Sequence, residues 1–303
     1  MSTTSLEAKL KEFLVHLIRV ATTQLPPDVV EALRRAYERE THPLAKKQLE
    51  AILRNVELAS KLWKPICQDT GTPYFYIKLG ENFPVRSRLY DVIKEAMREA
   101  TRIVPLRPNA VDPFRERNTG DNTGQRVPWV HVEIVPGDRL EVTYVPKGGG
   151  SEAPSTLVMA PPIKGLEKLK ETVVKTILEA GARPCPPVIV GVGVAAGADM
   201  ALTLAKMAAV LRPVGSRHPD PEIAKLEEEL LEAVNKIGIG PHGFGGSTTA
   251  LDLHIEYAHR HPATYAIAVV TSCWATRRAS GVFRPDGSWE ITSHKNLPPI
   301  PEE

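Results

Sequence analysis

The 303-residue sequence has little cysteine and no long apolar run. No apolar segment approaches the ~20 residues that a membrane-spanning helix needs, and the N-terminus lacks the apolar core of a signal peptide. Only three cysteines occur, an odd number spread widely over the chain, so we expect no disulfide framework. These absences predict a cytoplasmic protein that does not contact a membrane.

Excess charge of either sign is also missing. Thirty-eight Lys and Arg residues oppose 36 Asp and Glu, and the two signs are interspersed along the chain. This pattern gives no indication of nucleic-acid binding, although a small anionic substrate remains compatible with it. The 27 prolines in a charge-rich sequence are consistent with a thermophile.

The spacing of apolar residues predicts an α+β (mixed α/β) fold. A helical N-terminal part reaches to about residue 64, and mixed sheet segments with packed helices follow it. Two strands on either side of Pro136-Gly137-Asp138 are predicted to pair as a hairpin. The predicted later helices cover residues 90–101, 165–180, 199–211 and 221–237, and the predicted strands cover residues 74–79, 129–135, 140–145, 187–194, 251–257, 263–272 and 289–292.

The three cysteines, Cys67, Cys185 and Cys273, lie in polar, glycine-rich or proline-rich segments. Free cysteines are often buried as small apolar residues, and that alternative applies here. The residues beside them favour metal binding instead. The prolines around Cys185 hold its thiolate in one direction and offer little apolar packing. Three thiolates are the ligand count of a cubane cluster that keeps one iron open, and thiolates favour iron–sulfur or zinc. Spacing alone does not show that the three cysteines meet.

Two glycine motifs allow a functional and a structural interpretation. Gly148-Gly149-Gly150, between Lys147 and Ser151, either exposes backbone to a ligand or turns the chain, and it lacks the ending of a P-loop. Gly191-Val-Gly193 follows an apolar run in the manner of a dinucleotide site. No acidic residue for a ribose follows at the expected distance, so close strand–helix packing is favoured over a nucleotide-dependent oxidoreductase.

Histidines and arginines supply weaker candidates. His254 alternates with apolar residues and is interpreted as a satisfied sheet residue. His259 and His261 lie where a predicted strand ends, a common place for site residues. Three arginines are candidates for binding a carboxylate: Arg107, Arg277 and Arg278.

Taken together, the motifs closely resemble the alpha subunit of class I, iron–sulfur dependent fumarate hydratase, a family shared with L-tartrate dehydratase. The likeness covers residues 5–290 in order. It is carried by Cys67-Gln-Asp-Thr-Gly-Thr72, Leu106-Arg-Pro-Asn-Ala-Val111, Asn118-Thr-Gly-Asp-Asn122, Lys147-Gly-Gly-Gly-Ser151, Pro184-Cys-Pro-Pro187 with Gly191-Val-Gly193, and Ser272-Cys-Trp274.

The resemblance implies a single iron–sulfur hydro-lyase alpha-subunit domain over residues 1–303. It implies a 4Fe-4S cluster held by Cys67, Cys185 and Cys273, whose open iron binds substrate as a Lewis acid. It also implies catalytic roles for Asp69, as an acid, and His261, which lines the pocket. The implied substrate contacts are Gln68, Arg107 and the backbone amide of Gly150.

The resemblance also implies a partner. Fused members continue into a second domain that supplies the base, whereas this sequence ends at Glu303. We therefore expect a separate beta subunit, activity only in the complex, and an α2β2 assembly or a homodimer of the chain alone. The expected reaction is reversible hydration of fumarate to (S)-malate, with L-tartrate dehydration as the alternative. A metal-binding subunit with a structural role only is a further alternative.

Overall fold

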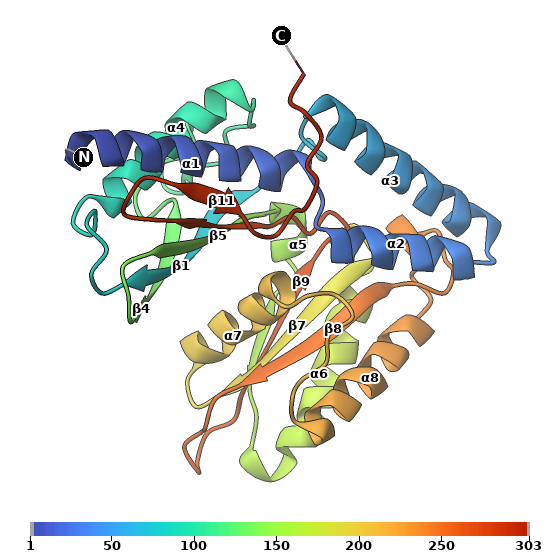
Figure 1. The fold of residues 1–303 in the computed structure, drawn as a ribbon. Coiled ribbons are helices and arrows are strands. Elements are labelled where there is room, and N and C mark those ends of the chain that lie inside the picture. The colour runs from blue at the N-terminus through green and yellow to red at the C-terminus, as the bar shows by residue number, and fades with distance from the viewer. Residues whose placement is uncertain (1–2, 302–303) are drawn as a thin grey trace. The chain divides into compact units, whose positions relative to one another are not determined.

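The computed structural model describes residues 3–301 and confirms the predicted α+β class (Figure 1). The chain forms two compact units. Unit 1 combines Met1–Pro26, Asn55–Lys147 and Arg277–Glu303, and unit 2 combines Pro27–Arg54 and Gly148–Thr276. The assignment of residues 1–303 to one hydro-lyase domain stays a prediction. No helix among residues 3–301 is long and apolar enough to cross a membrane.

The longer helices lie where apolar periodicity predicts them, whereas the four-residue helix α5 was not predicted. The helical N-terminal part consists of three helices that end at Leu62. The α-helices are α1 (Thr3–Thr23), α2 (Pro27–Arg39), α3 (Pro43–Leu62), α4 (Leu89–Ile103), α5 (Gly149–Glu152), α6 (Gly165–Ala180), α7 (Ala198–Leu211) and α8 (Pro221–Lys236), with short 3-10 turns at η1 (Pro162–Lys164) and η2 (Pro241–Gly243).

The strands form one sheet in each unit and a small two-stranded ribbon in unit 1. Four of them, β2, β3, β6 and β10, were not predicted from the sequence. The strands are β1 (Thr72–Gly80), β2 (Val111–Asp112), β3 (Arg117–Asn118), β4 (Trp129–Val135), β5 (Leu140–Lys147), β6 (Thr156–Met159), β7 (Val188–Ala195), β8 (Ala250–Tyr257), β9 (Ala266–Ser272), β10 (Ala279–Phe283) and β11 (Trp289–Ile291).

The sheet of unit 1 has the order β11-β10-β5-β1-β4, so the predicted β4–β5 hairpin is wrong. β1 lies between the two strands, parallel to β4 and antiparallel to β5. The turn between β4 and β5 instead bonds to the end of β1. Gly80 N donates to Arg139 O and Asn82 N donates to Gly137 O, each at 2.9 Å. Alternating apolar residues identify strands correctly but do not specify their partners.

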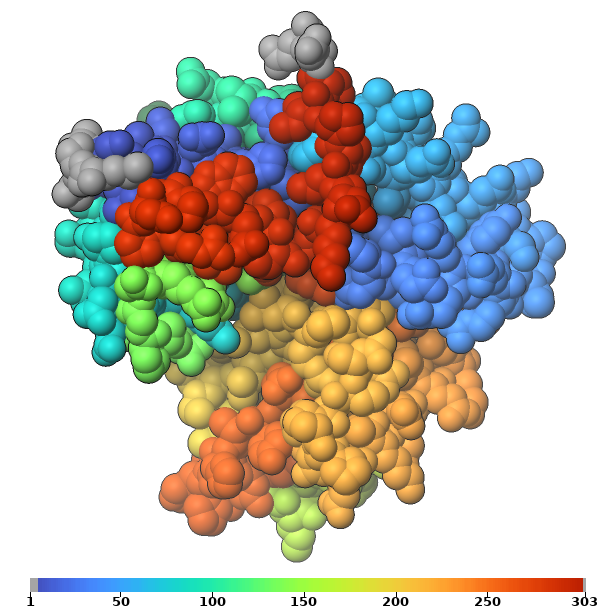
Figure 2. Space-filling view, viewed as in Figure 1, coloured from blue at the N-terminus to red at the C-terminus, as the bar shows by residue number. Residues whose placement is uncertain are grey.

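The core of unit 1 lies between this sheet and helices α1 and α4. Aromatic residues contribute to it. The ring centroids of Phe75 and Tyr144, on adjacent strands, lie 4.8 Å apart with the rings tilted, and Phe13 of α1 lies against Phe283 of β10. The C-terminal segment, red in Figure 2, lies over the blue N-terminal helix. Trp63 Nε1 donates to Pro299 O at 3.0 Å, which fastens this segment to the unit.

The sheet of unit 2 has the order β6-β9-β7-β8, with helices on both faces (Figure 1). β7 runs parallel to β8 and antiparallel to β9. The valines of β7 share a core with apolar residues of α6 and α8. The opposite face of β7 carries Gly191 and Gly193 and is covered by α7.

Gly191 and Gly193 lie inside β7 rather than in a turn, which excludes the dinucleotide interpretation of this motif. A Cβ at Gly191 would overlap Ala205 O, and a Cβ at Gly193 would overlap Ala201 O. The glycines therefore serve close packing of β7 against the alanine-rich face of α7, as the sequence analysis favoured.

We expect Gly193→Ala to lower the free energy of unfolding by about 1–3 kcal/mol, because the added methyl forces β7 and α7 apart. Chemical denaturation measures the change. Gly124→Ala is the matched control, since a Cβ there meets only an ordinary contact with Thr119. Equal stability of the two variants would contradict the close-packing account.

Candidate functional site

The segment that follows α3 in unit 1 carries Cys67, Gln68 and Asp69. Its start is anchored by Ile66, whose N–H donates to Thr22 O at 3.2 Å and whose carbonyl accepts from Asn55 Nδ2 at 2.8 Å. Cys67 and Asp69 are half-buried and Gln68 is exposed. The segment thus presents polar side chains from a fixed backbone.

The loop before β2 packs against this segment. Thr70 Oγ1 donates to Arg107 O at 3.2 Å and accepts from Arg107 N at 3.0 Å. Asp69 Oδ1 accepts from Gly71 N at 2.9 Å and from Asn109 Nδ2 at 3.3 Å. The structure therefore brings together the predicted residues Cys67, Gln68, Asp69 and Arg107 from two distant motifs.

The buried Asn122 joins its motif, residues 118–122, to the loop that carries Arg107 and Asn109. Asn122 is 1% exposed, and its side chain accepts from Asn109 N at 2.7 Å and donates to Arg107 O at 3.1 Å. Its backbone adopts a positive φ of 58°, which asparagine tolerates better than most residues. Asn109 and Asn122 were quoted as parts of motifs, but their role in orienting Asp69 and Arg107 emerges only from the fold.

Two arginines add positive charge to this part of unit 1. The side chain of Arg107 is exposed and has no hydrogen bond or ion pair with residues 3–301. Arg277 is 2% exposed and donates from Nη2 to Asp69 O at 2.8 Å. Its Nε and Nη1 are buried without a partner in the described chain. Buried donors that lack an acceptor are costly and are typical of a site that binds an anion.

Unit 2 gathers Cys185, Cys273 and Gly150 at one end of its sheet. Trp274 N donates to Cys185 O at 3.3 Å, which places the two cysteine segments side by side. Cys185 adopts a positive φ of 55°, and Thr276 Oγ1 donates to Cys273 O at 2.7 Å. Gly150 lies beside Arg183 O, and its neighbour Ser151 accepts from Thr271 Oγ1 at 2.8 Å.

His261 lies at the other end of the same sheet. It belongs to the exposed loop between β8 and β9, and the whole length of β9 separates it from Cys273. Seven strand residues span roughly 20 Å. One copy of unit 2 therefore does not bring His261 beside Cys185 and Cys273, and its catalytic role stays a prediction.

His242 was not identified from the sequence. Its backbone N–H donates to the carbonyl oxygen of Pro186, next to Cys185, at 2.8 Å. The centroid of its ring lies 6.3 Å from that of Trp274. Gln48 Nε2 donates to Nδ1 at 3.1 Å, so Nε2 carries the proton of the neutral ring, and Nε2 is buried without a partner in residues 3–301. Burial lowers the pKa of His242. The feature of the sequence that could have indicated His242 is the glycine-rich run around it, Gly240-Pro-His-Gly-Phe-Gly-Gly246.

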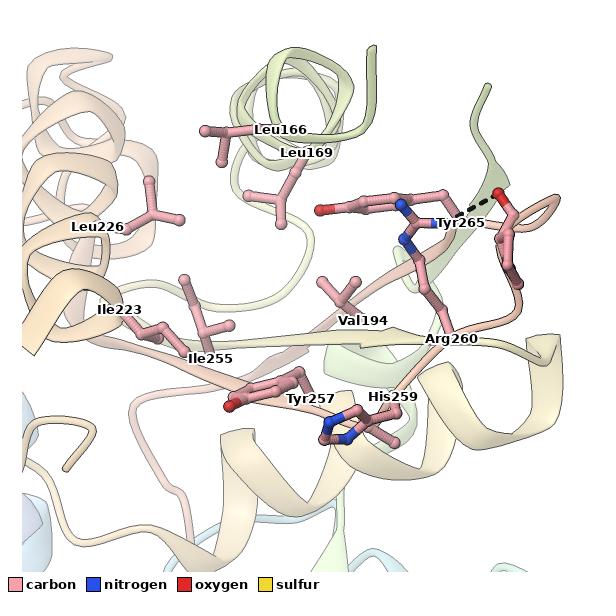
Figure 3. A pocket seen from close by; sticks show the side chains of 12 residues that line it. Leu166, Leu169, Val194, Ile223, Leu226, Ile255, Tyr257, His259, Arg260 and Tyr265 are labelled. Carbon is pink, nitrogen blue, oxygen red and sulfur yellow. Dashed lines mark hydrogen bonds between the residues drawn. The ribbon is translucent and has the colours of Figure 1, made fainter. Parts of the chain in front are cut away.

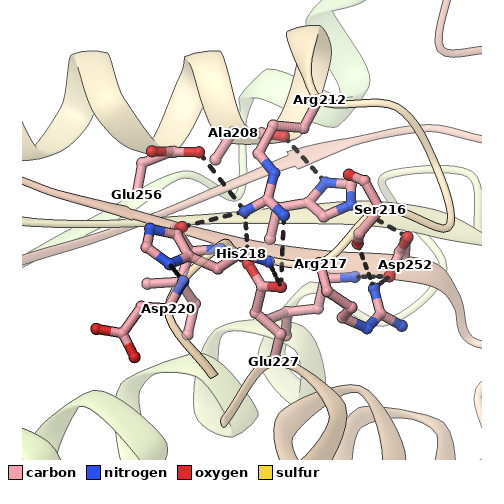
Figure 4. A network of polar contacts seen from close by, with 12 residues as sticks. Ala208, Arg212, Ser216, Arg217, His218, Asp220, Glu227, Asp252 and Glu256 are labelled. Carbon is pink, nitrogen blue, oxygen red and sulfur yellow. Dashed lines mark hydrogen bonds and ion pairs between the residues drawn. The ribbon is translucent and has the colours of Figure 1, made fainter. Parts of the chain in front are cut away.

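A second cluster of ionisable groups in unit 2 is structural (Figure 4). His254 is fully buried and bonded to Ala208 O and Asp252, which confirms its interpretation as a satisfied sheet residue. Arg217 Nη1 donates to Asp252 Oδ1 at 2.7 Å. The fully buried Glu227 accepts from Arg212 at 2.6 Å and from Ile255 N at 2.7 Å. Each of these carboxylates already accepts hydrogen bonds from protein donors, so we interpret the cluster as structural.

The donor chemistry of the cysteines fits an iron–sulfur cluster. Each of the three is a thiol rather than half of a disulfide. Unit 2 brings two of them together, with Cys185 exposed and Cys273 half-buried. Cys67 belongs to unit 1, and within residues 3–301 no three His, Cys, Asp or Glu side chains are placed as ligands of one metal ion.

Comparison with known proteins identifies the class as a hydro-lyase. The family model described as "Fumarate hydratase (Fumerase)" matches residues 11–282, and the chain belongs to this family. A "Putative L(+)-tartrate dehydratase subunit alpha" from Methanocaldococcus jannaschii is 44% identical over 275 residues, covering 89% of this chain and 96% of the relative. L(+)-tartrate dehydratase subunit alpha is 41% identical in Escherichia coli O157:H7 and 40% in strain K12, with 94% of each chain covered.

The Asp252 cluster makes the stability of the chain depend on pH. Burial alone would raise the pKa of Asp252, but hydrogen bonds from His254, Gly215 and Arg217 outweigh it and lower the pKa. A lowered carboxyl pKa stabilises the fold above the unfolded value of about 3.9 and ceases to do so as the pH falls through the folded value. We expect Asp252→Asn to cost about 3 kcal/mol at pH 7 and progressively less as the pH falls below about 3.9, measured by denaturation across this range.

Glu228→Gln is the control for this prediction. Glu228 pairs with the same Arg217 at 3.6 Å, but its side chain is 66% exposed. An exposed ion pair of this kind contributes less than about 1 kcal/mol. A pH-independent difference between wild type and Asp252→Asn would contradict the assignment of the linkage to Asp252.

Proposed function

We propose that this chain is the alpha subunit of a 4Fe-4S dependent hydratase for a four-carbon dicarboxylate, with Cys67, Cys185 and Cys273 as cluster ligands. The proposal depends most on the Trp274–Cys185 backbone bond, which joins two of the three cysteine segments in a chain of the fumarate hydratase family. Within unit 1, Arg277, which follows Cys273 by four residues in the sequence, donates to the carbonyl oxygen of Asp69.

A bound cluster with one iron lacking a protein ligand would supply Lewis-acid chemistry toward the substrate hydroxyl and carboxylate. The chain supplies charge and orientation. Arg107 and Arg277 offer guanidinium donors to the substrate carboxylates, and Gln68 and the Gly150 amide offer neutral donors. Asp69 acts as the acid, and the bonds from Gly71 and Asn109 to Oδ1 fix its orientation, as proton transfer requires.

The proposed partner is a beta subunit that supplies the base for the carbon-bound proton. The names of the relatives, each a subunit alpha, support this proposal. We propose that activity requires the complex, in an α2β2 assembly, and that the chain alone forms a homodimer. A catalytic His261 would have to reach the site from another copy of the chain, because β9 separates it from Cys273 in its own unit.

We propose hydration of fumarate to (S)-malate as the reaction. The description of the family supports it. Dehydration of L-tartrate is the second candidate, and the names of the curated relatives favour it. Anaerobic assays of the complex on fumarate, malate and both tartrates separate the two, since the physiological substrate should have the highest kcat/KM. Iron and sulfide analysis of the same sample distinguishes the hydratase from a zinc-binding or metal-free structural subunit.

Cys185→Ser and Cys273→Ser should each lose most of the iron and acid-labile sulfide of the anaerobically reconstituted complex, because a hydroxyl is a poor cluster ligand. His261→Asn is the control and should retain both. Circular dichroism checks that the variants fold. A Cys185→Ser complex with the full iron and sulfide content would overturn the ligand assignment.

Arg107→Met should lower kcat/KM for every dicarboxylate about 100-fold, because a charged donor to a carboxylate contributes about 2.7 kcal/mol. Arg115→Met is the matched control, since Arg115 lies in the same loop but pairs with Asp112 at 2.8 Å. Steady-state kinetics of the two complexes provides the measurement. Similar losses in both variants would refute a specific role for Arg107.

A further inference from the structure

We propose that a cavity in unit 2, between α6 and α8, is a binding site for a medium-chain fatty carboxylate. The cavity has a volume of about 560 Å³, which lies in the range of small-molecule pockets. It lies at the end of the sheet away from Cys185 and Cys273, beside the loop that carries His261. We call it the α6–α8 cavity.

The walls of the α6–α8 cavity are aliphatic (Figure 3). Leucines of α6 and apolar residues of α8 face one another across it, and β7 and β8 form its floor. Such a wall favours a flexible hydrocarbon chain, which gains free energy with each methylene that leaves water. The aliphatic lining residues are Leu166, Leu169, Val194, Ile223, Leu226 and Ile255.

The polar groups of the cavity gather at one end, where the loop after β8 begins (Figure 3). Arg260 is held there by its own loop, since Nη1 donates to His261 O and Pro262 O, each at 3.1 Å. Its guanidinium also stacks on Tyr265, 5.2 Å from the ring centroid. The cation is thus fixed before any ligand arrives, which reduces the entropy cost of binding.

The charge of Arg260 is not neutralised by the protein. Among residues 3–301 it forms no ion pair with a carboxylate, and the twelve residues that line the cavity include no Asp or Glu. Its Nε and Nη2 make no hydrogen bond within the described chain. A cation beside an aliphatic cavity matches a ligand with one anionic head and an apolar tail.

Gly165 leaves space for the ring of Tyr265, on which the Arg260 guanidinium lies. A Cβ at this first residue of α6 would overlap the ring of Tyr265. Burial raises the pKa of Tyr265. The ring that supports Arg260 therefore packs directly against Gly165 at the start of α6.

Isothermal titration of the full chain with sodium butanoate, hexanoate, octanoate and decanoate tests the proposal. Affinity should rise about fourfold per added methylene until the cavity is filled. Octan-1-ol should bind at least tenfold more weakly than octanoate. Absence of saturable binding, as would follow if another chain covers the cavity, overturns the proposal, and so does equal affinity for the alcohol and the acid.

Arg260→Met should weaken octanoate at least tenfold and leave octan-1-ol unchanged, because the apolar wall remains. Arg183→Met is the matched control, since the side chain of this exposed arginine of unit 2 donates to the carbonyls of Ala180 and Glu179 and lies outside the cavity lining. Gly165→Ala should also weaken octanoate by displacing Tyr265. Octanoate affinity that is unaffected by both Arg260→Met and Gly165→Ala overturns the assignment of the head-group site.

Discussion

The packing of β7 directly against α7 is the constraint on which the layout of unit 2 depends. Two glycines let the strand backbone approach the helix so closely that no side chain separates them. β7 is the central strand to which both β8 and β9 are bonded, so its position fixes both neighbours. Because strands keep their register over their whole length, this contact also decides which residues gather at each end of the sheet.

The two ends of that sheet have different chemistry. The end that carries Cys185 and Cys273 is polar and holds backbone in left-handed conformations, with buried donors nearby. The other end, at the close of β7 and β8, is aliphatic with a single cation. The two proposed sites thus lie toward opposite ends of one sheet.

Much of the fold could be predicted from the sequence, because helices and strands follow local apolar periodicity. Strand pairing could not, since β1 inserts between two strands that are neighbours in the chain and the alternating pattern carries no information about partners. The site was only partly predictable. The quoted motifs contain Cys67, Arg107 and Asn122, whereas the contacts that Asn122 and His242 make are visible only in the fold. The position of His261 depends on strand direction, which motifs do not encode.

The insertion of β1 also has a consequence for how the chain is made. β5 is bonded on one side to β1 and on the other to β10, a strand of residues 279–283 near the C-terminus. Until residues 279–283 have left the ribosome, β5 presents one unpaired edge of backbone donors and acceptors. Such an edge readily pairs with a strand of another molecule. The order of synthesis therefore leaves this edge of β5 open to aggregation until β10 has paired with it.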